Sequence, residues 1–302
     1  MTQLAGDNKA SLVIDNRSAP VARLVGHMAL TKPRISLMVV VTAGIGMAMV
    51  PQWTWVTLLG TLFGTALASM GANTLNQVLE QDTDAKMQRT MSRPLPAGRM
   101  STIEALVAGL CCSIAGIAIL WTLTGALAAA LAAATIGAYC LVYTPMKRVS
   151  PSALLIGAVP GAMGPVIGYA AAAGRIEVAA WLLFAIMFVW QVPHFLAIAW
   201  LYRDQYAAAG LPVLAVLDPT GVRSGRQILI GCLTLLPLGG LPTMLGVSGS
   251  IYFFTALACG MMFLAFGIAL VIRPSRPRAR RLFLASLVYL PVVLTVMMTN
   301  KI

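Results

Sequence analysis

Charged residues are scarce in this 302-residue chain. Only 10% of the residues are charged, 59% are hydrophobic, and the mean hydropathy is +0.85. This composition excludes an ordinary soluble domain and indicates a polytopic membrane protein. The chain holds nine Asp and Glu against 21 Lys and Arg. These cations lie at the ends of apolar segments, as membrane anchors do, so we expect no nucleic-acid partner.

Cysteine and histidine are also rare. The five cysteines all lie in apolar stretches without CxxC spacing, so we interpret them as small buried hydrophobic residues and not as metal ligands or redox groups. Only one of the two histidines, His194, lies inside an apolar segment. A facing pair of intramembrane histidines is therefore missing, which excludes a bis-histidine electron-transfer cytochrome.

Long runs without a charge define the membrane spans. The uncharged runs are residues 35–79, 105–146, 149–174, 178–202, 228–272 and 282–300. At about 20 residues per span, the three runs longer than forty residues each hold two helices and the others hold one, which predicts nine spans. We expect the long runs to turn near residues 51–53, 124–125 and 246–250. Pro160, Gly161, Gly164 and Pro165 predict a kink in the fifth span.

The nine-span arrangement separates the cations. It places 19 of the 21 Lys and Arg on the side of the N-terminus and only Arg175 and Lys301 on the other. The positive-inside rule then predicts a cytoplasmic N-terminus and a C-terminus on the opposite side. The predicted fold is one all-α membrane domain, residues 1–302, with nine transmembrane helices around a central cavity that opens to the cytoplasm. Residues 1–30 would form a cytoplasmic tail and an interfacial helix.

The densest polar stretch, residues 73–99, follows the second predicted span. Asn76, Glu80 and Asp84 are spaced i, i+4, i+8, which stacks three oxygen donors along one face of a helix. Such donors suit Mg²⁺, which is bound in proteins by one or two carboxylates together with phosphate oxygens. Four cations that suit a phosphate follow, at Lys86, Arg89, Arg93 and Arg99. The stretch therefore predicts a diphosphate site at the membrane surface, although ordinary interfacial charges would give a similar composition.

This stretch also resembles a known family. The Asn-x3-Glu-x3-Asp pattern with the following residues 89–96, RTMSRPLP, resembles the first acidic motif of the intramembrane aromatic prenyltransferases. Within that superfamily, the NQxxE opening and the DAxMxRTxxRPL continuation are similar to the haem O synthase branch, as is Glu80, where much of the superfamily has Asp. Residues 190–214, with WQVPHF and AGLPVL blocks, resemble the same branch. In the superfamily this second loop carries another acidic motif.

The resemblance implies an activity and its partners. It implies transfer of a farnesyl group from farnesyl diphosphate to a vinyl group of haem B, giving haem O for terminal oxidases. The implied cofactor is Mg²⁺, the implied location is the plasma (inner) membrane, and the implied partners are farnesyl diphosphate, haem B, membrane lipid and haem A synthase. Gln205 stands where the family has an acid, so the nearby Asp204 is expected to take its metal role.

The resemblance also assigns roles to individual residues. The metal ligands would be Asn76, Glu80, Asp84 and Asp204; the catalytic residues Asn76, Glu80, Asp84 and His194; and the diphosphate ligands Arg34, Lys86, Arg89, Arg93, Lys147 and Arg148. An intramembrane histidine could bind a haem iron or propionate, act as a base, or bond to a carbonyl freed by Pro193.

Two other functions remain compatible with the sequence. One is a related prenyltransferase that acts on a quinone precursor or a chlorophyllide, which the DAxMxRT and WQVPHF blocks argue against. The other is a transporter, whose charges would mark a pathway at mid-bilayer. The acidic residues of the motif cluster at one membrane face, which favours a reaction chamber at the surface.

Overall fold

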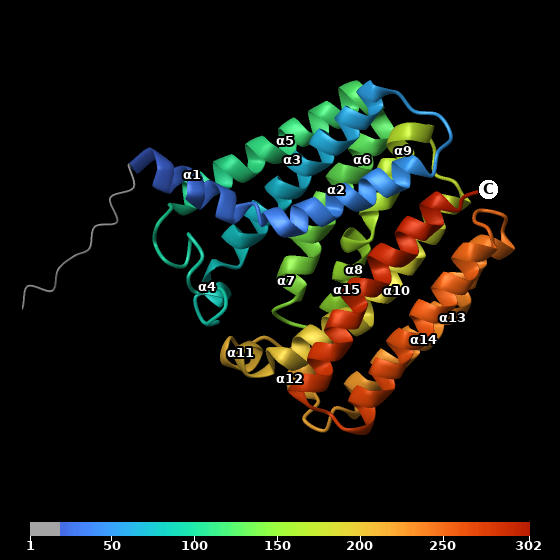
Figure 1. Cartoon of the computed structure of the whole chain (residues 1–302). Helices are drawn as coiled ribbons and strands as arrows, with labels where there is room; N and C mark the ends of the chain where they lie inside the picture. The colour runs from blue at the N-terminus through green and yellow to red at the C-terminus, as the bar shows by residue number, and fades with distance from the viewer. Residues whose placement is uncertain (1–18) are drawn as a thin grey trace, which may run out of the picture.

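The computed structural model describes residues 19–302, and it is built from helices (Figure 1). In chain order the elements are α1 (Ala19–Leu30), α2 (Pro33–Ala48), α3 (Trp55–Leu79), α4 (Gln81–Asp84), α5 (Thr102–Thr124), α6 (Ala126–Gly137), the π-helix η1 (Ala138–Tyr143), α7 (Thr144–Met146), α8 (Ala153–Gly161), α9 (Met163–Ala173), α10 (Val178–Leu201), α11 (Arg203–Ala208), α12 (Leu214–Leu217), α13 (Val222–Met244), α14 (Ser250–Ile272) and α15 (Arg276–Thr299). Residues 19–302 form no β-strand. The predicted tail up to residue 18 lies outside the described residues.

The predicted all-helical membrane fold is confirmed. Within residues 19–302, eight helices are long and apolar enough to cross a membrane, and there are nine if the bent pair α1–α2 counts as one span. The helix α2 has 16 residues, about 24 Å at 1.5 Å per residue, and so falls short of a hydrocarbon layer of about 30 Å. The three predicted turns all fall between helices, namely between α2 and α3, α5 and α6, and α13 and α14. The central cavity stays a prediction.

The predicted kink in the fifth span is also confirmed. The helices α8 and α9 meet at Ala162, which has φ −96° and ψ −1°. Pro165 has no backbone N–H, so it cannot donate to the carbonyl of Gly161, its i−4 partner in a continuous helix. The neighbouring helix α10 contacts α8 just before the bend, where Nε2 of Gln191 donates to the carbonyl of Ala158 at 3.2 Å.

Two helix pairs touch backbone to backbone. A Cβ atom on Gly116 of α5 would collide with the backbone of Ala68 in α3, and one on Gly168 of α9 would collide with the carbonyl of Ala43 in α2. Small residues let membrane helices approach this closely. The contacts hold α3, whose end carries the acidic motif, in a fixed position against α5.

The loops gather at two opposite ends of the bundle (Figure 1). The C-terminus and the α13–α14 linker share one end, where the N–H of Gly249 donates to the carbonyl of Asn300 at 2.8 Å. At the same end, Nζ of Lys301 donates to the carbonyl of Ala48 at 2.7 Å. The other end carries α4, α11 and α12. The loops with the acidic motif and the second motif therefore lie at the same end, as the span count requires.

Two hydrophobic clusters position that end. The largest core lies among α10, α13, α14 and α15 and fully buries Tyr252, Phe263 and Tyr289. A smaller cluster contains Met87, Tyr206, Ala209 and Leu211. Since Met87 follows α4 and the other three belong to α11 and its linker, this cluster ties the two polar loops together.

Candidate active site

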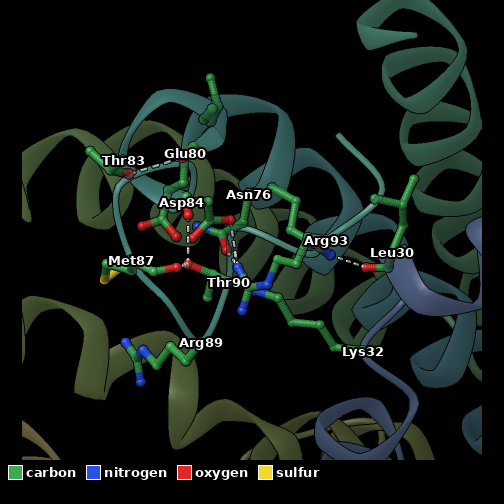
Figure 2. A network of polar contacts seen from close by, with 12 residues as sticks. Leu30, Lys32, Asn76, Glu80, Thr83, Asp84, Met87, Arg89, Thr90 and Arg93 are labelled. Carbon is green, nitrogen blue, oxygen red and sulfur yellow. Dashed lines mark hydrogen bonds and ion pairs between the residues drawn. The ribbon is translucent and has the colours of Figure 1, made fainter. Parts of the chain in front are cut away.

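Asn76, Glu80 and Asp84 form a ladder where α3 ends. The N–H of Glu80 donates to the carbonyl of Asn76 at 2.9 Å, and the N–H of Asp84 donates to the carbonyl of Glu80 at 2.8 Å, so the i, i+4 register continues through the break between α3 and α4. All three side chains are buried and gather in one place (Figure 2). The predicted stacking of three oxygen donors on one helical face is confirmed.

Each oxygen donor of the ladder contacts a cation from another segment or a later part of the loop. The contacts are Lys32 Nζ to Asn76 Oδ1 at 2.8 Å, Lys147 Nζ to Glu80 Oε1 at 2.9 Å, and Arg93 NH1 to Asp84 Oδ2 at 2.5 Å. Buried carboxylates are stable as anions only when paired in this way. The structure therefore brings together acids and cations that are far apart in the sequence.

Burial and charge compete at the Glu80–Lys147 pair. Burial alone would raise the pKa of Glu80, but the charges of Lys147, Lys32 and Arg93 and the hydrogen bond from Lys147 outweigh it, so the pKa lies below its ordinary value of 4.5. Burial alone would lower the pKa of Lys147, yet Tyr143 and Glu80 outweigh it and raise that pKa above 10.5. Both groups are consequently charged at neutral pH.

Lys32, and not Arg34, is the cation that the start of α2 contributes. Lys32 lies between α1 and α2 with φ +46°, and it is the only non-glycine residue with positive φ among residues 19–302. A left-handed conformation is unfavourable for a lysine. With this backbone conformation, the ammonium group of Lys32 points toward Asn76. The side chain of Arg34, in contrast, is exposed and makes no polar contact with the described residues.

The loop after α4 folds back over the ladder. The hydroxyl of Thr90 donates to the carbonyl of Asp84 at 2.9 Å, and Met87 and Leu95 are buried beneath the loop. This packing directs Arg93 to Asp84 (Figure 2). Lys86, which was expected to bind diphosphate, is exposed at the surface.

The second polar loop meets the first through Arg89. The guanidinium of Arg89 lies 4.8 Å from the ring centroids of both Tyr202 and Tyr206 and donates to the Tyr206 hydroxyl at 2.8 Å. The backbone N–H of Arg89 donates to Oε1 of Gln205 at 3.2 Å. Gln205 therefore faces the acidic-motif loop although it is not an acid.

Asp204, the expected fourth metal ligand, points elsewhere. Its carboxylate pairs with Arg276 of α15 at 2.5 Å, and its side chain is 76% exposed, against 1% for Asp84. The structure does not bring Asp204 to the ladder. The difference follows from helical geometry, because adjacent residues of α11 point about 100° apart.

Arg148 forms a separate ion pair at the edge of the site. Its guanidinium contacts both carboxylate oxygens of Asp82, at 2.5 and 2.9 Å, and donates to the carbonyl of Leu79. The hydrogen bonds from Arg148 more than offset the effect of desolvation and lower the pKa of Asp82. These contacts join the linker after α7 to α4 and to the end of α3, next to the Lys147–Glu80 pair.

His194 lies on α10 and is buried against α15. Its Nδ1 is 2.6 Å from the hydroxyl of Ser286, and its ring stacks on Trp190 with a centroid distance of 4.5 Å. The Ser286 hydroxyl donates its proton to the carbonyl of Phe283, so it can only accept from His194. His194 is therefore the Nδ1–H tautomer with a lone pair on Nε2. Its polar partner is this serine and not a carbonyl freed by Pro193.

Four contacts at this end were not assigned from the sequence: those of Lys32, Thr144, Gln205 and Tyr206. Thr144 is buried and accepts a hydrogen bond from Nδ2 of Asn76 at 3.0 Å. Lys32 could have been found from the sequence, because it is a cation directly before the proline that begins the first span. Gln205 and Tyr206 stood beside the expected acid. Thr144 left no comparable signal.

The ladder fits a magnesium ion that is shared with phosphate. Its donors are two carboxylates and an amide oxygen, which are hard oxygen ligands of the kind that Mg²⁺ prefers. Among residues 19–302, no group of three His, Cys, Asp or Glu could hold a metal ion by itself. Further ligands would have to come from a bound diphosphate or water.

The sequence of the chain matches those of known proteins over nearly its whole length. The model of the UbiA prenyltransferase family matches residues 37–290. A relative from Solibacter usitatus, named protoheme IX farnesyltransferase, is 42% identical over 286 residues, which cover 91% of this chain and 98% of the relative. A protein of the same name from Opitutus terrae is 41% identical over 283 residues, covering 93% of this chain and 96% of the relative.

Solved structures share the fold. A structure described as digeranylgeranylglyceryl phosphate synthase superimposes with a TM-score of 0.78 at 17% identity, covering 92% of this chain and 98% of that one. A UbiA homolog from Archaeoglobus fulgidus, bound to GPP and Mg²⁺, gives a TM-score of 0.66 at 13% identity, with coverages of 90% and 99%. The acidic motif, the helical membrane fold and the sequence relatives agree: the chain is an integral membrane protein that belongs to the UbiA prenyltransferase family.

Proposed function

We propose that this prenyltransferase transfers a farnesyl group from farnesyl diphosphate to a vinyl group of haem B and so forms haem O. One observation supports haem B as the acceptor: relatives named protoheme IX farnesyltransferase are more than 40% identical to this chain over nearly their full length. The buried ladder of Asn76, Glu80 and Asp84 with its cations supports the diphosphate half of the reaction.

The charge of the ladder suits a magnesium–diphosphate complex. Lys32, Arg93 and Lys147 oppose the two carboxylates Glu80 and Asp84, which leaves one positive charge. A prenyl diphosphate with one Mg²⁺ retains roughly one negative charge, so binding would neutralise the site. We infer that the carboxylates and Asn76 then hold the metal while the released cations turn to the phosphate oxygens. The A. fulgidus homolog with bound GPP and Mg²⁺ supports a metal of this kind.

The residues would assist the cleavage of the allylic C–O bond. When this bond breaks, its electron pair leaves with the diphosphate, and Lys147, Arg93 and Lys32 would stabilise the developing negative charge. Mg²⁺ would act as a Lewis acid on the same oxygens. The vinyl π electrons of haem then attack the farnesyl cation, and water adds to the resulting carbocation with loss of a proton. Tyr139 and Tyr143, stacked at 5.4 Å, could shelter the cation.

We further propose how the chain lies in the membrane. Among residues 19–302, most Lys and Arg lie in or beside the segments at the end that carries α4 and α11, whereas Arg175, between α9 and α10, and Lys301, after α15, belong to the other end. The positive-inside rule favours this end as cytoplasmic, the C-terminus on the opposite side, and the plasma (inner) membrane as the location. The chain would act as one domain, with membrane lipid around it and haem A synthase as the enzyme that receives haem O.

The test is an assay of the purified chain in detergent or nanodiscs. With haem B, farnesyl diphosphate and Mg²⁺, we expect haem O and pyrophosphate in equal amounts by chromatography and phosphate analysis. Parallel reactions with an aromatic quinone precursor test the related prenyltransferase activity. Prenylation of that acceptor, with haem B unchanged, would disprove the proposed acceptor and retain the family assignment.

A further inference from the structure

The hydroxyl of Thr144 links the acidic ladder to the π-helix η1. Thr144 lies at the end of η1, and both its N–H and its hydroxyl donate to the carbonyl of Tyr139, with Oγ1 at 2.8 Å. On its other side, Oγ1 accepts from Nδ2 of Asn76 at 3.0 Å. Thr144 and Asn76 are both buried, at 1% exposure, so water has little access to compete for these groups.

The proton count at Thr144 fixes the orientation of the Asn76 amide. A hydroxyl has one proton, and the carbonyl of Tyr139 can only accept, so the proton of Thr144 points there. Toward Asn76 the hydroxyl presents only lone pairs, and the amide must turn its NH₂ to Thr144 and its oxygen away. Lys32 gives the same answer independently, because an ammonium group only donates and it contacts Oδ1.

The π-helix explains why the Tyr139 carbonyl is available to Thr144. In a π-helix the carbonyl of residue i is bonded from residue i+5, so the acceptor for Thr144 becomes Tyr139 in place of Cys140. This register places the Thr144 hydroxyl beside the same carbonyl. Single π turns of this kind often occur at functional sites.

We propose that Thr144 is a positioning residue that keeps the oxygen of Asn76 directed to the metal–diphosphate site. This inference rests on the proposed function only in that a metal–diphosphate complex binds at the ladder. When Lys32 turns to the phosphate, Thr144 is the remaining partner that distinguishes the two ends of the amide. Without it, the amide is free to rotate and present NH₂, which cannot ligate a metal.

The first measurement is the affinity for Mn²⁺, as an EPR-visible substitute for Mg²⁺, in the presence of a non-hydrolysable farnesyl diphosphate analogue. Thr144→Val removes the hydroxyl at nearly constant volume, and we expect Mn²⁺ to bind about tenfold more weakly, the effect of one lost hydrogen bond. Thr144→Ser retains the hydroxyl and should stay within about twofold of the unmodified protein. Unchanged affinity in Thr144→Val would overturn the proposal.

The decisive comparison uses a ligand with two equivalent ends. A carboxylate presents an oxygen whichever way it turns, so in an Asn76→Asp background the addition of Thr144→Val should change Mn²⁺ affinity by less than about twofold. A purely structural role of Thr144 would weaken binding equally in both backgrounds, and that result refutes the inference. Thr144→Ala serves as a second variant if Thr144→Val does not fold, and loss of the folded protein in both assigns Thr144 a structural role.

The outcomes separate this inference from the proposed acceptor. An unmodified protein that binds Mn²⁺ and the analogue but leaves haem B unchanged would disprove the acceptor, and the Thr144 comparison would still decide the inference. An unmodified protein that binds neither would overturn both.

Discussion

The Glu80–Lys147 pair allows a quantitative test of how the candidate site is held together. The two charged groups are 2.9 Å apart, and their side chains are 8% and 17% exposed. Removing one partner of a buried ion pair costs about 3–5 kcal/mol, because the remaining charge is left without compensation. We therefore expect Glu80→Gln and Lys147→Met to lower the free energy of unfolding, and the double variant to lower it by less than the sum.

The surrounding charges predict that the two single variants differ. Glu80→Gln leaves Lys32, Arg93 and Lys147 against one carboxylate, whereas Lys147→Met leaves two cations against two carboxylates. The glutamine variant should thus be the less stable of the two. The coupling energy of the cycle should reach about 1–3 kcal/mol in favour of the pair.

The assay is reversible unfolding of the purified protein in mixed micelles, followed by circular dichroism for all four proteins of the cycle. Additive effects of the two substitutions, or a more severe effect of Lys147→Met, would refute the charge argument. The pH dependence gives a second measurement. Since the pKa of Glu80 is lowered in the folded protein, its contribution is complete above its unfolded pKa near 4.5 and is lost as the pH falls below that value. Glu80→Gln should flatten this acid limb.

Three further predictions follow from the structure. Asp84→Asn should reduce turnover and Mn²⁺ binding by about a hundredfold or more, since it removes a negative charge from the expected metal ligands. The matched control Thr83→Ala should bind Mn²⁺ with an affinity within a few fold of the unmodified protein. Near-normal Mn²⁺ binding by Asp84→Asn contradicts the metal assignment. Ala97→Cys should react with an impermeant maleimide only from the cytoplasm and Leu245→Cys only from the other side, whereas labelling from the same side contradicts the orientation. His194→Ala should impair haem conversion more than it impairs binding of the farnesyl diphosphate analogue. If conversion and binding fall equally while the protein stays folded, the role of His194 is structural.

The helical spacing of the first motif was sufficient to predict its geometry. Asn76, Glu80 and Asp84 were expected on one face, and the i, i+4 backbone bonds place them there even though the helix breaks at Glu80. The kink at Ala162 followed from the local covalent chemistry of proline. The stacked donors and the kink both depend on residues that are close in sequence, so a local sequence pattern is enough to predict them.

The partners of the ladder could not be read from the sequence in the same way. Lys32 and Arg34 are two residues apart, and the choice between them depends on the left-handed backbone at Lys32. Asp204 and Gln205 are adjacent, and the direction of each depends on how α11 docks through Tyr206 on the first loop. Both choices are decided by tertiary packing. The sequence pattern does not contain that packing, and for this reason it placed Asp204 at the ladder, whereas in the structure Asp204 pairs with Arg276.

The backbone contact between α3 and α5 bears on how a long-chain substrate reaches the ladder. Gly116 touches the backbone of Ala68, and Gly71 of α3 lies against Ser113 of α5, so the two helices leave no lateral opening between them. An isoprenoid tail that diffuses in the lipid layer cannot pass through this wall. Any route that brings the tail from the lipid layer to the ladder would therefore have to avoid the α3–α5 contact.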